Sequence, residues 1–148
     1  MIVMNKSELL DVMRREVGMS YDRAVDRDDF LVRIMDAIHL LSGERASVTA
    51  YEYDTDGENR LFYQRSSRPE LDTSAHFDGW TGLSEAGHIM CMKRNDCLNV
   101  MIPVMKEDRI HVRLGISFEA ADYEVTVEDF IFCEELIYFI QSKRSRLP

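Results

Sequence analysis

One short segment of the sequence carries three side chains of the types that bind zinc or iron. His88 and Cys91 are separated by two residues, and Cys97 follows after five more, which gives the pattern H-x2-C-x5-C. Imidazole and thiolate groups are ligands for both metals, but a tetrahedral site would need a fourth ligand from elsewhere. The two cysteines are also further apart than in common zinc motifs. We therefore predict no metal site, and keep His88, Cys91 and Cys97 as the alternative metal-binding set.

A second set of polar side chains is spread over three stretches with the composition of β-strands, residues 46–54, 98–105 and 109–118. Side chains alternate between the two faces of a strand, and in each stretch one alternate set is apolar. The other set contains Tyr51, Tyr53, Asn99, Met101, His111 and Arg113. Guanidinium and amide donors from neighbouring strands could hold a small anion or carboxylate. We predict a ligand-binding face here; the alternative is a solvated face of the sheet.

The patterns of the common nucleotide-binding and hydrolytic sites are absent from the sequence. There is no Walker-type glycine loop, no G-x-G-x-x-G, no G-x-S-x-G and no H-E-x-x-H. This lowers the expectation of an enzyme, and we assign no catalytic residue.

The elements that must position these residues are helices at both ends and two β-hairpins between them. Asn5 or Ser7 can cap a short first helix, and a stronger second helix follows Asp28 and ends at Ser42. Residues 46–54 and 60–65 form the first predicted hairpin, and 98–105 and 109–118 form the second. Residues 66–95 are predicted to form a long loop, with room for one short helix or strand, and this segment includes Trp80 and His88. A last helix begins at Thr126, with Phe130, Cys133, Leu136, Ile137 and Ile140 on its apolar face.

Length and charge limit the classes of protein to which the chain can belong. Its 148 residues are 45% hydrophobic and 30% charged, which fits one domain over residues 1–148. Within it we expect N-terminal helices over 1–43, the sheet and its loop over 46–119 and the C-terminal helix over 126–145. The net charge of -9 argues against direct binding to nucleic acid or to an anionic membrane. The odd number of cysteines, without a secretory or membrane-spanning segment, predicts free thiols in the cytoplasm.

The order of these elements resembles the GAF family. The segment Asn99-Val-Met-Ile-Pro-Val104 is similar to the family's apolar strand that ends in a Pro-hydrophobic pair, and Thr126-Val-Glu-Asp-Phe130 resembles its F-T-x-E-D helix start. Asp78-Gly-Trp-Thr-Gly-Leu83 is similar to the glycine pair before the pocket loop. Glycine stands late in the last strand, at Gly115, where members usually carry it early. No cysteine stands in a chromophore-attachment context.

This resemblance implies an α+β fold with a central antiparallel sheet of about six strands. Helices from both termini would lie on one face and support a homodimer, while a loop-covered sensory pocket would lie on the other. We therefore expect a regulatory domain, in signal transduction or transcription regulation, that binds an unidentified small molecule. The ligand-binding set is then Tyr51, Tyr53, Trp80, His88, Asn99, Met101, His111 and Arg113.

Two alternative functions remain open. Gly87-His-Ile-Met-Cys91 resembles the segment around the catalytic cysteine of free methionine-R-sulfoxide reductases, which are single GAF domains. Cys91 would then attack the sulfoxide and Cys97 would resolve the intermediate, although the family's second cysteine lies upstream. The other alternative is an interaction scaffold without a ligand, related to profilin-like folds.

Overall fold

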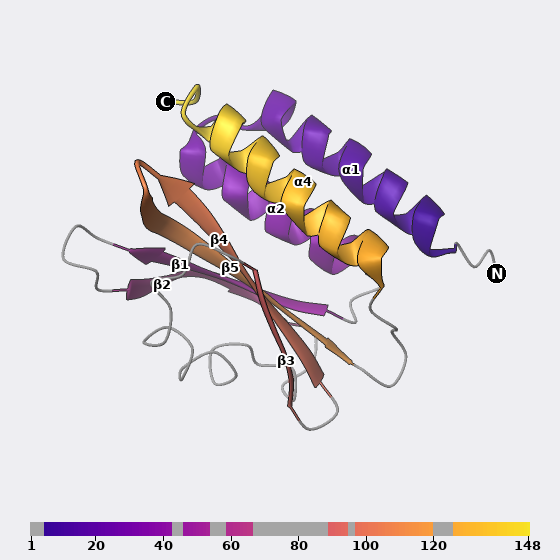
Figure 1. The fold of residues 1–148 in the computed structure, drawn as a ribbon. Coiled ribbons are helices and arrows are strands. Elements are labelled where there is room, and N and C mark those ends of the chain that lie inside the picture. The colour runs from indigo at the N-terminus through magenta and orange to yellow at the C-terminus, as the bar shows by residue number, and fades with distance from the viewer. Residues whose placement is uncertain (1–4, 43–45, 54–58, 67–88, 95–96, 120–125) are drawn as a thin grey trace.

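A computed structural model describes residues 5–42, 46–53, 59–66, 89–94, 97–119 and 126–148. Figure 1 shows the described helices on one side of a β-sheet. The elements, in chain order, are α1 (Lys6–Arg23), α2 (Arg27–Leu41), β1 (Ala46–Tyr53), β2 (Asn59–Arg65), β3 (Met90–Arg94), β4 (Cys97–Lys106), β5 (Arg109–Glu119) and α4 (Val127–Arg144). The predicted α+β fold with a central antiparallel sheet is confirmed, with five strands in the described residues.

The sheet has the strand order β2-β1-β5-β4-β3, and every neighbouring pair is antiparallel. β1 and β2 form the first predicted hairpin, and β4 and β5 form the second. β1 and β5 join the two hairpins in an unbroken register from Ala46 opposite Phe118 to Glu52 opposite Val112. β3 lies within the predicted loop segment, for which the sequence allowed one short helix or strand without giving its position.

The turn between β4 and β5 consists of Glu107 and Asp108, both with positive φ angles of 53° and 63°. Two positive φ angles are typical of the tight type I′ turn, which suits the twist of a hairpin. The register breaks close to this turn, because Val104 pairs with Val112 and Met105 pairs with Ile110. His111 is therefore the extra residue of a β-bulge, and a bulge redirects the side chains of its strand.

The helices begin at capping residues that the sequence partly identified. Asn5 Oδ1 accepts a hydrogen bond of 2.9 Å from the backbone N–H of Glu8, as predicted for the first helix. The second helix is capped by Asp26, two residues before the predicted Asp28. At α4 the Asp129 carboxylate accepts from the backbone N–H of Thr126 at 2.8 Å, so aspartate serves here where glutamate is usual.

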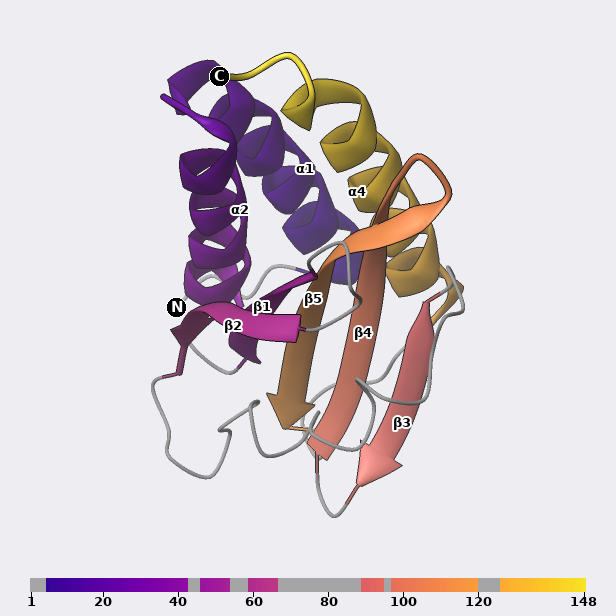
Figure 2. The same ribbon diagram turned by 90° about the vertical axis from the view of Figure 1, so that its left-hand side faces the viewer.

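The helices form two layers above the sheet. α2 packs on β1 and α4 packs on β4, while α1 lies outside them and contacts both (Figures 1 and 2). No helix in the described part of the chain is both long and apolar enough to cross a bilayer.

The hydrophobic core lies between these helices and one face of the sheet. Phe30, Ile34 and Ile38 of α2 are at most 2% exposed, and they meet Val48 and Leu114 from the central strands. On α4 the buried residues are Phe132, Cys133, Leu136 and Ile140. The prediction that Phe130 lies on the buried face is wrong, because its side chain is 39% exposed and Phe132 takes that place.

The core position of Ile34 leads to a first prediction. Ile34→Ala should lower the free energy of unfolding by about 2–5 kcal/mol, because it leaves a cavity at a site with 0% exposure. Leu40→Ala, at a position on the same helix that is 52% exposed, should lower it by less than about 1 kcal/mol. Urea denaturation of both variants measures the difference, and similar losses for the two would contradict this placement of α2.

Candidate functional site

The face of the sheet opposite the helices brings together most of the side chains that the sequence grouped. Tyr51 of β1 pairs directly with Arg113 of β5, and Met101 and Asn99 of β4 pair with Gly115 and Ser117 of β5. Directly paired residues on antiparallel strands place their side chains on the same face. We refer to Tyr51, Tyr53, Asn99, Met101, Arg113 and Ser117 as the polar face.

The polar face is shielded from water, although no described helix lies over it. Asn99 is 0% exposed, Met101 and Arg113 are 1% exposed, and Tyr51 is 6% exposed. The alternative of a solvated sheet face is therefore wrong. A buried arginine is rare among globular proteins and needs compensating contacts.

Arg113 lies at the centre of the polar face and contacts both an aromatic ring and a sulfur atom. Its guanidinium carbon is 5.3 Å from the ring centroid of Tyr53, and its Nη1 is 3.8 Å from the Sδ of Met101. Burial lowers the pKa of Arg113 below its ordinary value, while the neighbouring Tyr53 opposes that shift. The side chain remains cationic because guanidinium groups are not deprotonated in proteins. The polar face therefore contains a buried positive charge.

Asn99 is the second polar group on this face that could contact a ligand. Ser117 Oγ donates to Asn99 Oδ1 at 2.6 Å, which fixes the orientation of the amide. The Nδ2 group of Asn99 is buried and has no hydrogen-bond partner among the described residues. A buried donor without an acceptor costs about 1–3 kcal/mol. The role of Ser117 as a partner of Asn99 was not predicted.

Other hydroxyl groups on the same face have protein partners. Ser47 Oγ donates to Ser66 Oγ at 2.7 Å, and Thr49 Oγ1 donates to the carbonyl of Tyr63 at 3.3 Å. Both bonds tie β1 to the β2 side of the sheet. The hydroxyl groups of Ser47 and Thr49 are therefore used in bonds within the protein, whereas the Nδ2 group of Asn99 has no partner among the described residues.

His111 does not lie on the polar face, and the prediction that it shares a face with Arg113 is wrong. Its Nδ1 atom lies 2.6 Å from Nη1 of Arg144, on α4. The helices are on the opposite side of the sheet, so the imidazole has been turned to the helical side. The β-bulge at His111 is the physical cause, because it interrupts the alternation on which the prediction rested.

Cys91 also faces the helices. It pairs with Val100, whose side chain belongs to the core beneath α4, whereas Met90 packs beside Tyr51 and Met101. Cys91 is an exposed residue, but partial burial of its thiol raises the pKa above the ordinary value, which lowers its thiolate fraction. Cys91 is therefore separated by the sheet from Arg113 and Asn99.

Three other predicted site residues are not described at the level of side chains. Trp80 and His88 lie outside the described residues, and of Cys97 only the backbone pairing with Glu119 is described. Within the described ranges, no group of three His, Cys, Asp or Glu side chains is arranged to hold a metal ion. The alternative metal set of His88, Cys91 and Cys97 accordingly stays an expectation.

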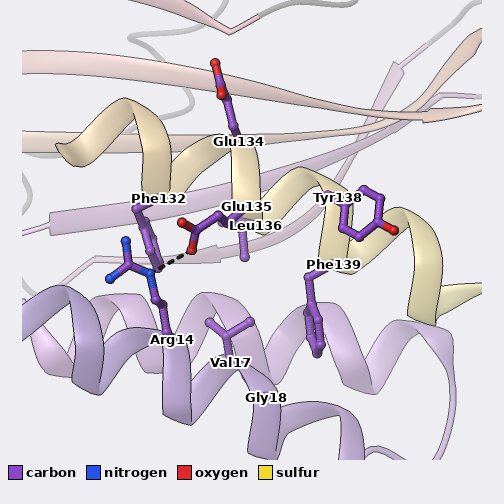
Figure 3. A pocket seen from close by; sticks show the side chains of 9 residues that line it. All are labelled: Arg14, Val17, Gly18, Phe132, Glu134, Glu135, Leu136, Tyr138 and Phe139. Atoms are coloured by element: carbon purple, nitrogen blue, oxygen red, sulfur yellow. Dashed lines mark hydrogen bonds and ion pairs between the residues drawn. The ribbon is translucent and has the colours of Figure 1, made fainter. Parts of the chain in front are cut away.

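A separate groove lies on the outer surface, between α1 and α4. It has a volume of about 490 Å³, and Val17, Leu136 and Phe139 form much of its apolar wall (Figure 3). Arg14 Nε and Glu135 Oε2 are joined across it at 2.7 Å. Tyr138 stands at its edge with 74% of its surface exposed.

The placement of the cysteines leads to a second prediction. At pH 7 iodoacetamide should label Cys91 more slowly than free cysteine, because thiolate is the reactive form and the pKa of Cys91 is raised. Cys133 should remain unlabelled in the folded protein, since burial raises its pKa to about 12. Labelling of Cys91 should accelerate as the pH rises above the ordinary range of a thiol. Peptide mass spectrometry separates the sites, and rapid labelling of Cys91 at pH 7 would instead support a catalytic thiol.

Comparison with known proteins relates the chain to others only through its fold. No model of a protein family matches the sequence, and no curated protein matches it. The GAF domain of a phosphoenolpyruvate-protein phosphotransferase from Coxiella burnetii superimposes with a TM-score of 0.71 and 13% identity over 96% of each chain. The corresponding Acinetobacter domain gives a TM-score of 0.68 and 16% identity, over 97% of this chain and 96% of that one.

A third similar structure is an enzyme. The free methionine-R-sulfoxide reductase from Neisseria meningitidis, solved with its substrate, gives a TM-score of 0.67 and 13% identity, over 97% of this chain and 93% of that one. The enzyme and the two phosphotransferase domains thus match nearly the whole length of this chain. The chain has the fold of GAF domains.

Proposed function

We propose that the chain is a regulatory domain that senses a small molecule at the polar face. The observation that carries this proposal is a buried guanidinium and a buried amide donor, Arg113 and Asn99, on the face of the sheet opposite the described helices. Structural sites seldom retain two such groups, whereas ligand sites combine a mostly apolar surface with a few polar groups that orient the ligand.

The chemistry of the polar face selects a class of ligand. Arg113 supplies a fixed positive charge, and Asn99 supplies a donor held in place by Ser117. Tyr51 and Met101, which belong to one buried cluster, would provide apolar contact to the ligand. A small organic molecule with a carboxylate or similar anionic group fits this combination. Trp80 and His88 remain proposed contacts of the same ligand.

The sheet also offers a route from this ligand to the surface. The strands that carry Tyr51 and Arg113 present Val48 and Leu114 to the helices on their opposite face. A ligand that moves these strands would change the packing of α2 and α4. We propose that the altered helices report to a second copy of the chain in the cytoplasm, without direct contact to nucleic acid or membrane.

The outer groove is the proposed surface for that second copy. Val127, Phe130, Ile131 and Tyr138 of α4 are exposed apolar or aromatic side chains, with between 39% and 74% of their surfaces accessible. Exposed apolar surface on this scale is typical of interaction sites. A twofold pairing of the α1 and α4 surfaces would bury the groove in both copies.

The two alternative functions have less support. A reductase that used Cys91 would need its thiol beside the ligand, but Cys91 lies on the helical side of the sheet with a raised pKa. A scaffold without a ligand gives no account of the unpartnered Nδ2 group of Asn99 among the described residues. The ligand-sensing proposal accounts for both observations.

The ligand proposal gives a third prediction. Native mass spectrometry of freshly purified protein should show an added small molecule, which can be released and identified. Arg113→Met should weaken its binding by about 30-fold or more, as measured by calorimetry, because the charge partner of its anionic group is lost. Arg60→Met makes the same change on β2, where the Arg60 side chain is 75% exposed, and should leave binding unchanged.

A second variant tests the same site if the Arg113 variant does not fold. Asn99→Ala should weaken binding by a smaller factor, and circular dichroism of each variant reports whether the fold survives. A bound molecule whose affinity is indifferent to Arg113 and Asn99 would contradict the polar face as the site. Protein without any bound molecule, and without stabilisation by organic acids, would favour the scaffold.

The pairing of helices gives a fourth prediction. Tyr138→Asp should convert the dimer into a monomer, because it places a charge within the apolar surface of the groove. Leu40→Asp, on α2 at a position 52% exposed and outside the groove, should leave the dimer intact. Analytical ultracentrifugation at several concentrations distinguishes the two. A wild-type chain that is monomeric at every concentration would contradict the proposed self-association.

A further inference from the structure

A second hollow lies on the helical side of the sheet, apart from the polar face. It forms where the β4–β5 turn meets the last turn of α4 and the start of α2, and Figure 2 shows the turn beside the C-terminal end of α4. Its volume is about 120 Å³. We refer to it as the basic pocket, after the lining side chains Arg27, Lys106, His111 and Arg144.

The charges around the basic pocket are unusual for this chain, whose net charge is -9. Three cationic side chains line it, and none of its lining residues in the described part of the chain is acidic. The carboxylate of Asp28 is 4.0 Å from Nη2 of Arg144, and its side chain is 64% exposed. Glu52, which also influences the pocket, is ion-paired with Arg60 at 3.1 Å. The pocket therefore keeps an excess of positive charge.

Arg144 is the buried member of this group, with 9% of its surface exposed. Its Nη1 lies 2.6 Å from Nδ1 of His111, and a guanidinium can only donate. His111 must therefore accept on Nδ1 as a neutral imidazole. The Nε group of Arg144 is shielded from water and has no hydrogen-bond partner among the described residues. One donor of a buried cation thus lacks an acceptor at the wall of a cationic hollow.

Two further side chains are fixed in position around the hollow. Arg27 donates through Nε to the carbonyl of Leu147 at 3.0 Å and through Nη2 to that of Ser145 at 3.5 Å. Gln141 Oε1 accepts from the backbone N–H of Met105 at 2.9 Å, which leaves its NH2 group as a donor. The pocket walls are therefore arranged before any ligand arrives, which lowers the entropic cost of binding.

We propose that the basic pocket binds a small oxyanion of the phosphate or sulfate class. The pocket has three cations, and one of them, Arg144, has a guanidinium donor without a partner among the described residues. These groups complement the charge and acceptor oxygens of a compact dianion, which arginine binds well. The volume lies far below the ~300 Å³ at which sites for drug-sized ligands begin, so a nucleotide does not fit within it. The anion would link the β4–β5 turn to α2 and α4.

Calorimetric titration with inorganic phosphate and with sulfate, at constant ionic strength, tests this proposal. We expect saturable binding of one anion per chain, and weaker binding of acetate because it carries a single charge. Lys106→Gln should weaken phosphate binding about tenfold. Lys106 is exposed, so this variant should fold like the wild type. Arg144→Lys keeps the charge but loses the planar fork, and it should also weaken binding.

Arg146→Gln is the matched control. It removes one positive charge at the same end of α4 from an exposed residue that does not line the pocket, and it should bind phosphate like the wild type. The imidazole signals of His111 should shift in NMR spectra during the titration. The proposal is overturned if there is no saturable binding up to about 10 mM phosphate. It is also overturned if Lys106→Gln and Arg146→Gln weaken binding equally, which would indicate general attraction of anions.

Discussion

The antiparallel pairing of β1 with β5 along the middle of the sheet is the constraint from which the rest of the structure follows. Its register is unbroken from Ala46 opposite Phe118 to Glu52 opposite Val112. Because side chains alternate with a period of two, a slip by one residue would exchange Arg113 and Leu114 between the faces. The observed register sends Leu114 to the helices and Arg113 to the opposite side. The core and the candidate site are thus two consequences of one pairing.

The same alternation fails where the pairing is irregular. The bulge between Ile110 and Val112 turns His111 toward α4, although Arg113, two residues later, keeps its place on the polar face. One strand therefore contributes to two sites on opposite sides of the sheet. The tight turn at Glu107 and Asp108 lies beside this bulge, and bulges are common where a ladder must re-aim a side chain near a functional region.

Local signals in the sequence were sufficient for most of the architecture. The Asn5 cap, the helical spacing of Ile34 and Ile38, and the two hairpins depend on neighbours in the chain, and the structure has them, although α2 is capped by Asp26. The position of β3 could not be predicted, because an edge strand of five residues that ends in Lys93 and Arg94 has no clean alternation of polar and apolar side chains. Burial could not be predicted either: the pattern grouped Arg113 with Asn99, but only the tertiary structure shows that both are removed from water.

The two candidate sites share one physical signature. Asn99 Nδ2 at the polar face lacks an acceptor among the described residues. Arg144 Nε at the basic pocket also lacks one. Sequences that fold well usually satisfy buried donors, and exceptions concentrate where a ligand completes the structure. The fold alone cannot name either ligand, because one fold supports many functions. The donors without partners among the described residues limit the class of ligand, because each would be satisfied by a hydrogen-bond acceptor, and a guanidinium such as that of Arg144 favours an anionic acceptor over a neutral one. The two proposed anion sites, one on each side of β5, would supply these missing acceptors.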